Sequence, residues 1–200
     1  MVAPLRRPRA GFTLLEALIA LAVVGLVLGN VVMMTRSSSN AYEQETSKST
    51  LELQLDQTLD RIVLALMAAS VDSLDPNASN PAFHDRLEFV QSLGVNDGEL
   101  VYSEPERIEF VLQGGEVVWK ENPGELDERM VTWSRWVREY LEGEVPNGID
   151  DNGNGLIDES GLSFVLQGTE VTVMLSLERP GPDGKPVVHT RSSIVHCRNT

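Results

Sequence analysis

The densest group of side chains that could bind a ligand is the acidic loop at residues 147–159, which reads Asn-Gly-Ile-Asp-Asp-Asn-Gly-Asn-Gly-Leu-Ile-Asp-Glu. Carboxylate, amide and carbonyl oxygens are the ligands that Ca²⁺ takes. When Asp150 is counted as the first place, oxygen donors fall on places three, five, seven and nine. These donors are Asn152, Asn154, Leu156 through its backbone carbonyl, and Asp158. The spacing matches the first nine places of an EF-hand-like calcium loop.

Three further positions of the acidic loop bear on this interpretation. Gly155 stands at the sixth place, where a sharp turn is needed, and we expect Ile157 at the eighth place to be an inward anchor. The twelfth place holds Gly161 instead of a bidentate glutamate, so Glu159 would have to complete the shell from a shorter loop. The alternative is a solvated turn between two strands, because Asn, Asp and Gly favour left-handed turns. We predict a structural Ca²⁺ site.

Glu16 is a carboxylate inside an otherwise apolar run from Phe12 to Met34. A helix of these 23 residues spans about 34 Å, enough to cross a hydrocarbon core of about 30 Å. Because a charge in such a helix costs about 2.5 to 3.5 kcal/mol, Glu16 needs a cationic partner. A cut between Gly11 and Phe12 would create one, since the new α-amine would lie one helical turn before Glu16.

Basic residues are distributed unevenly around this apolar run. The basic residues before the run are Arg6, Arg7 and Arg9, and the next Lys or Arg is Arg36. We therefore expect the leader to stay cytoplasmic and the chain beyond residue 35 to face the other side. Two alternatives are an ordinary signal peptide cut near Ala20–Ala22 and a plain signal anchor. The first would leave Val23–Leu28 as an exposed apolar tail.

The segment Gly11-Phe12-Thr13-Leu14-Leu15-Glu16 resembles the class III leader of type IV pilins and type II secretion pseudopilins. The resemblance implies that a prepilin peptidase removes residues 1–11 by cutting after Gly11 and then methylates Phe12. It also implies that Glu16 helps to recruit or register the subunit in a filament. The expected partners are therefore other pilin-like subunits, through the N-terminal helix, and the peptidase.

A second apolar pattern continues the N-terminal helix. Its residues recur at steps of three and four, which predicts one apolar stripe along a helix. They are Leu51, Leu55, Leu59, Ile62 and Leu66. We expect one helix from Phe12 to about Ala69, with a transmembrane part at 12–34 and an amphipathic continuation at 35–69. The loop Ser70–Pro81 ends it, and residues 70–200 form an extracytoplasmic β-rich domain.

The chain from Arg86 onward changes to short runs typical of strands. The predicted strands are Leu87–Gln91, Glu99–Ser103, Arg107–Leu112, Glu116–Lys120, Leu162–Leu166, Glu170–Glu178 and Val187–Cys197. Gly114–Gly115 and Gly181–Gly184 fit hairpin turns. The segment Met130–Leu141 fits a helix and a strand, and we favour the strand. We expect Trp133 and Trp136 to pack in the core or at an edge.

A long helix packed on an antiparallel sheet is an α+β fold, and this arrangement resembles the pilin fold. Three segments are also similar to J-type minor pseudopilins and the related W-type minor pilins. They are Leu59–Ile62, Arg107–Phe110 and Val117–Trp119.

The net charge of −14 and the isoelectric point near 4.6 argue against direct nucleic-acid binding, which needs a clustered basic face. No nucleophile elbow, phosphate-binding loop or zinc-protease motif is present, so we expect no enzyme. Cys197 is the only cysteine, which excludes an intrachain disulfide. We expect it to be a small apolar residue at a strand end, with an intermolecular disulfide as the alternative.

These patterns together predict a single-pass protein of the bacterial inner membrane with an extracytoplasmic C-terminal domain. The most specific interpretation is a minor pseudopilin that nucleates or caps a type II secretion pseudopilus. One alternative is a minor type IV pilus subunit used for adhesion, motility or DNA uptake. Another is a membrane-anchored calcium-binding domain unrelated to filaments.

Overall fold

The computed structural model describes residues 13–76, 82–181 and 184–197. Gly11, Phe12 and the three leader arginines lie outside these residues. The chain divides into two compact units, Met1–Glu43 and Gln44–Thr200, and each is described by itself. Helix α1, Leu14–Ala68, contributes to both units, so the structure has the long helix predicted from the sequence.

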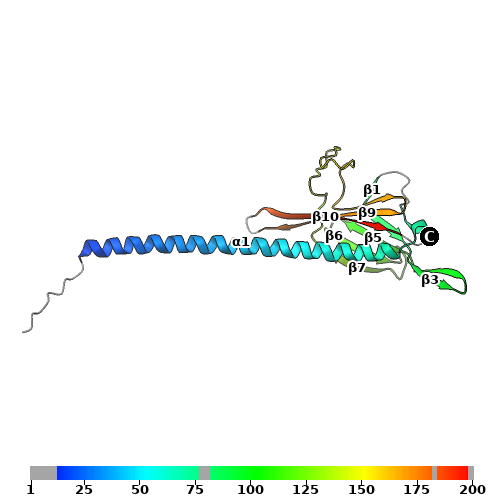
Figure 1. Cartoon of the computed structure of the whole chain (residues 1–200), viewed down its shortest axis with the longest axis horizontal. Coiled ribbons are helices and arrows are strands. Elements are labelled where there is room, and N and C mark those ends of the chain that lie inside the picture. Colours follow the sequence, from blue (N-terminus) through cyan, green and yellow to red (C-terminus); the bar gives the residue numbers. More distant parts are fainter. Residues whose placement is uncertain (1–12, 77–81, 182–183, 198–200) are drawn as a thin grey trace, which may run out of the picture. The chain divides into compact units, whose positions relative to one another are not determined.

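The second unit contains ten strands in the described part of the chain (Figure 1). One antiparallel sheet has the order β1-β8-β9-β10, a second has the order β2-β5-β6-β7, and β3 and β4 form a hairpin. The strands of the first sheet are β1 Phe83–His84, β8 Leu162–Gln167, β9 Glu170–Pro180 and β10 Pro186–His196. Those of the second are β2 Arg86–Phe89, β5 Glu106–Val111, β6 Glu116–Glu121 and β7 Arg129–Ser134. The hairpin strands are β3 Ser92–Asn96 and β4 Glu99–Tyr102.

The predicted apolar stripe of α1 forms the centre of the core. Leu51, Leu55, Ile62 and Leu66 have no exposed surface, and Leu59 is also buried. They belong to one cluster with inward side chains of both four-stranded sheets, including Leu87, Ile108, Phe164 and Leu175. Burying these side chains is the main favourable term in folding this unit. The α+β fold class, a long helix packed on antiparallel sheets, is confirmed.

Two strands were not predicted from the sequence. β1 has only two residues and exists because Phe83 and His84 pair with β8. β3 contains Gly94, and its register with β4 shifts between Ser92 and Gly94. Gly and a bulge weaken the alternating pattern on which strand prediction depends.

The segment Met130–Leu141 is a strand only in its first part, so the strand prediction is wrong beyond Ser134. Trp136 adopts a positive φ of 70°, which ends the extended conformation. The chain then crosses between the two sheets. The Val137 N–H donates to the Gly115 carbonyl at 2.8 Å, and the Arg138 N–H donates to the Ser176 carbonyl at 3.0 Å. We call residues 135–141 the seam, because they hydrogen-bond to both sheets.

Gly161 lies where the seam meets strand β8. Its N–H donates to the Glu139 carbonyl at 3.0 Å, and its carbonyl accepts the Ser176 N–H at 2.7 Å. A Cβ added at Gly161 would lie 1.8 Å from the Arg138 carbonyl oxygen. The backbones approach so closely here that only glycine fits.

Cys197 directly follows β10 and belongs to the core, with 3% of its surface exposed. Its Sγ–H donates to the Leu66 carbonyl at 3.3 Å. Burial raises the pKa of the Cys197 thiol, so the reactive thiolate is disfavoured. The interpretation as a small buried residue at a strand end is confirmed, and this environment does not favour an intermolecular disulfide.

Candidate assembly helix and acidic loop

The N-terminal part of α1 is apolar on every side and covered by nothing within its own unit. Every large apolar side chain from Leu14 to Met34 is at least half exposed. An 18-residue window of the helix has a mean hydropathy of 2.5 and no buried residue. By length and composition the helix can cross a membrane. A surface this apolar requires lipid or other apolar helices around it.

Glu16 lies in the first turn of this helix. Its backbone N–H donates to the Thr13 hydroxyl at 3.3 Å, so Thr13 caps the helix. A threonine followed three residues later by glutamate is the sequence of a capping box, and a negative charge suits the positive helix N-terminus. The printed cap uses the backbone of Glu16, while its carboxylate is an acidic group in the first helical turn, so an experiment on the assembly role of Glu16 must separate that role from this local effect.

The acidic loop is wound around its first aspartate. The Asp150 carboxylate accepts backbone N–H groups from Gly153 at 2.6 Å, Asn154 at 3.2 Å and Gly155 at 2.8 Å. The Asn152 side-chain oxygen accepts the Asn154 N–H at 3.0 Å. These bonds place the predicted donors on one tightly turned segment.

Later residues close the acidic loop. The Asn154 side-chain oxygen accepts the Leu156 N–H at 2.9 Å, and the Asp158 carboxylate accepts the Gly148 N–H at 2.9 Å. The expectation that Ile157 is an inward anchor is wrong, because its side chain is 52% exposed. The loop is held by hydrogen bonds to its own carboxylates, and the apolar side chain at its eighth place does not pack into the core.

Two glutamates beneath the acidic loop are buried. Glu159 has no exposed surface, and its Oε1 atom accepts the side-chain amide of Asn154. Glu144 is 3% exposed, and its two oxygens accept the Asn152 N–H at 2.9 Å and the Asp158 N–H at 3.2 Å. Sequence reasoning missed Glu144, because it precedes the first place of the loop and no motif position marks it.

Within the described ranges, no three His, Cys, Asp or Glu side chains are grouped closely enough to hold a metal ion by themselves. Asp150, Asp158 and Glu159 therefore do not form a carboxylate cage as they stand. An ion at the acidic loop would also need amide and carbonyl oxygens from Asn152, Asn154 and Leu156. Such mixed oxygen shells are ordinary for Ca²⁺.

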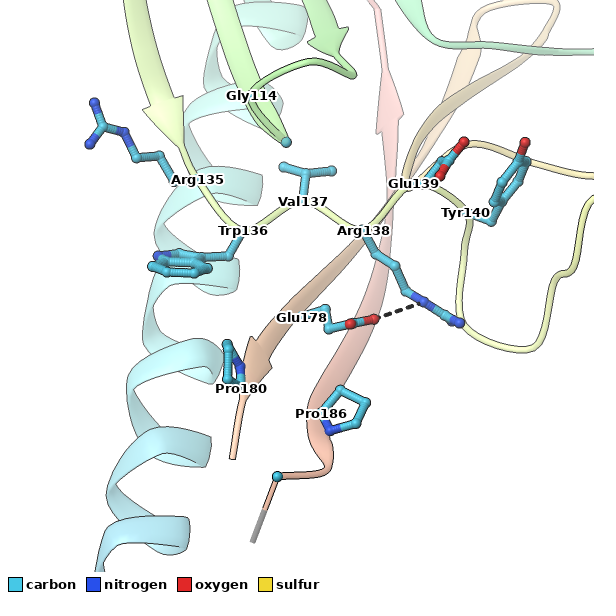
Figure 2. A pocket seen from close by; sticks show the side chains of 12 residues that line it. Gly114, Arg135, Trp136, Val137, Arg138, Glu139, Tyr140, Glu178, Pro180 and Pro186 are labelled. Atoms are coloured by element: carbon cyan, nitrogen blue, oxygen red, sulfur yellow. Dashed lines mark ion pairs between the residues drawn. The ribbon is translucent and has the colours of Figure 1, made fainter. Parts of the chain in front are cut away.

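A groove of about 970 Å³ lies along the seam (Figure 2). Trp136 is 44% exposed in it, with the Arg179 guanidinium 5.4 Å from the ring centroid. Figure 2 shows Arg138 extending to Glu178, with which it forms an ion pair at 3.0 Å. No Ser, Thr, Cys or His is among the described residues that line the groove. The groove therefore contains no side chain of the usual nucleophile–base pairs.

The two tryptophans differ in their surroundings. Trp133 is partly buried against the core and stacks on Trp119, with ring centroids 6.2 Å apart and planes 7° from parallel. Trp119 also donates its ring N–H to the buried Glu106 carboxylate at 2.6 Å. Trp133 thus packs at the core, whereas Trp136 lies at the edge of the groove.

Comparison with known proteins bears on the N-terminus alone. Residues 6–29 match the family model described as the prokaryotic N-terminal methylation motif. The chain thus has the prepilin-type motif of type IV pilin-like precursors, which implies processing by a prepilin peptidase and assembly with other pilin subunits. A search of curated proteins and a search of solved structures each found no match.

Proposed function

We propose that this protein is a minor pseudopilin, a structural subunit that nucleates or caps a type II secretion pseudopilus once its leader has been removed. The observation that carries this proposal is the methylation motif at residues 6–29, which includes the start of helix α1, together with the exposure of every large apolar side chain from Leu14 to Met34. In this role the apolar helix lies in the bacterial inner membrane before assembly and packs against neighbouring helices afterwards. The β-rich unit faces the extracytoplasmic side, and the subunit performs no catalysis.

The charge of Glu16 explains how assembly could be ordered. After cleavage, the α-amine of Phe12 is positively charged near neutral pH, since such amines have an ordinary pKa of about 7.7 to 8.0. Within a bilayer, a buried Glu16 carboxylate is strongly favoured to pair with a positive group. A newly added subunit could satisfy its Glu16 with the Phe12 amine of a neighbour, which fixes the axial position of one helix against the next.

Processing is tested with the substitution Gly11→Leu. We expect wild-type protein from native membranes to begin at a methylated Phe12, and the variant to keep its leader and migrate more slowly on electrophoresis. N-terminal mass spectrometry reads both outcomes. Ala10→Ser is the matched control, because it changes the neighbouring residue and leaves the cut bond intact. A wild-type chain that begins at Met1, or beyond Leu15, would contradict the proposal.

Assembly is tested with Glu16→Leu, beside Thr13→Ala. We expect Glu16→Leu to be processed and inserted but to lose most crosslinks to other pilin-like subunits, because the Phe12 amine no longer has its carboxylate. Thr13→Ala removes the helix cap, at a cost of about 0.5 to 2 kcal/mol, and should still assemble. Crosslinking in native membranes, with the neighbours identified by mass spectrometry, measures both.

The same crosslinks decide between the candidate roles. Neighbours from a secretion pseudopilus support the minor pseudopilin, whereas neighbours from a surface pilus would assign the protein to that filament instead. If Glu16→Leu assembles normally, the proposed pairing is refuted. If wild-type protein has no pilin-like neighbour at all, an anchored domain unrelated to filaments is favoured.

A further inference from the structure

Glu159 is an unusual carboxylate in this structure. Its side chain has no exposed surface, and its Oε2 atom has no hydrogen-bond partner within the described residues. The other oxygen contacts the side-chain amide of Asn154, so the carboxylate faces the fifth place of the acidic loop. A buried polar atom without a partner is rare in folded proteins and requires an explanation.

The buried glutamates also carry charge that must be balanced. Glu144 is also buried, with 3% of its surface exposed, and its carboxylate accepts the N–H of Asp158, the residue before Glu159. Among the described residues, no Arg or His forms an ion pair with Glu144, Glu159, Asp150 or Asp158. Burial of a carboxylate is expensive unless its oxygens are paired, and the Oε2 atom of Glu159 has no hydrogen-bond partner among the described residues. A bound cation would provide such a partner.

The donor atoms determine which cation fits. The side chains of the acidic loop that could donate to a cation are carboxylates and amides, which offer oxygen atoms, and the loop contains no His or Cys. Such hard oxygen donors suit Ca²⁺ and Mg²⁺ rather than zinc or copper. Mg²⁺ keeps several waters and demands near-ideal octahedral geometry, whereas Ca²⁺ accepts many protein oxygens in an irregular loop.

We infer that residues 150–159 bind a single Ca²⁺ ion, with Glu159 completing the shell from its buried side. The other ligands are the side-chain oxygens of Asp150, Asn152, Asn154 and Asp158 and the Leu156 carbonyl. Glu144 is a positioning residue, because its two oxygens hold the backbone N–H groups of Asn152 and Asp158. The carboxylates turn inward when the ion binds, since they are not grouped as a cage without it.

The place of this loop in the fold gives the ion a structural role. Tyr140 and Ser160 form a β-bridge on either side of the loop, and Gly161 follows at once. The ion would therefore stabilise the connection between the seam and strand β8. Ca²⁺ binding to the folded state alone raises stability in proportion to the logarithm of the ion concentration.

Titration of the full-length protein in detergent, after removal of metals with a chelator, tests the inference. We expect calorimetry to show one Ca²⁺ per chain with a dissociation constant below about 1 mM, the upper range for extracellular calcium modules. Thermal unfolding should shift to higher temperature with CaCl₂ and return after chelation. MgCl₂ at the same concentration should have a much smaller effect.

Variants assign the ligands. Asp150→Asn and Glu159→Gln should each weaken Ca²⁺ binding by about tenfold or more. Asp151→Asn is the matched control: it removes the same charge from the same loop, but Asp151 stands at the second place, where its carboxylate accepts the Asn147 side-chain amide at 2.7 Å. Its affinity should stay within about twofold of wild type. Glu144→Ala should weaken binding, and Glu144→Gln, which keeps an acceptor oxygen, should recover part of it.

Folding of each variant is checked by circular dichroism in chelator. Glu159→Gln removes a buried charge and should be at least as stable as wild type without metal. The inference is overturned if saturable Ca²⁺ binding is absent below about 1 mM. It is also overturned if Mg²⁺ binds equally well, or if Asp151→Asn and Asp150→Asn are equally harmful. Because all measurements use the purified chain, these results are independent of whether it assembles into a filament.

Discussion

Gly161→Ala should destabilise the β-rich unit by at least about 3 kcal/mol, at the upper end of the range for overpacked sites. The added Cβ would lie 1.8 Å from the Arg138 oxygen and 2.7 Å from the Arg138 carbonyl carbon. These are backbone atoms, and they cannot move aside easily. The Arg138 N–H is bonded to Ser176, and Gly161 itself is bonded to Glu139.

Denaturant unfolding of the full-length protein in detergent, followed by near-ultraviolet circular dichroism, measures this loss, because the stacked Trp119–Trp133 pair gives a signal from the packed state. Gly114→Ala is the matched control. The three atoms nearest to its Cβ would all belong to the side chain of Glu116, the first at 3.1 Å, and that side chain can rotate away. We expect a loss below about 1 kcal/mol for the control. Equal stabilities for the two variants would show that the backbone of the seam can shift to make room for the added Cβ.

Leu55→Ala should cost about 2 to 5 kcal/mol, the usual range for removing a buried leucine. Leu55 is completely buried in the stripe of α1, and its truncation leaves a cavity between the helix and the sheets. The measurement is the same denaturant unfolding. In the native host, the variant should also accumulate to a lower level, because unfolded protein is degraded.

Leu53→Ala provides a control two residues away on the same helix. Leu53 is 59% exposed, so the same chemical change creates no cavity and slightly improves helix propensity. We expect its stability to stay within about 0.5 kcal/mol of wild type. If both variants lose the same amount, the assignment of the buried face of α1 would be incorrect.

The elements predicted best are those that local pattern alone determines. The stripe from Leu51 to Leu66 repeats with the helical period, and burial of all five residues follows from it. The hairpin at Gly114–Gly115 lies between β5 and β6 as expected, since two runs of alternating residues flank two glycines. At both places the local sequence pattern and the observed structure agree, and tertiary contacts stabilise the same conformation.

Prediction from the sequence failed where tertiary contacts determine the local conformation. Met130–Leu141 fits two periods, and its end as a strand depends on Trp136 and on hydrogen bonds to two separate sheets. In an EF-hand, helices flank the loop and bury the residue at the eighth place, whereas here a β-bridge and a strand leave Ile157 exposed. Glu144 acts through backbone N–H groups up to 14 residues away, which no sequence motif records.

The burial of the only cysteine makes the chain convenient for site-specific labelling. An engineered cysteine at an exposed helical position such as Ser38 would be the accessible thiol of the folded protein, with the native residue left in place. A fluorophore or spin probe there would follow the proposed passage of this helix from lipid into an assembled fibre, in a protein whose core is unaltered.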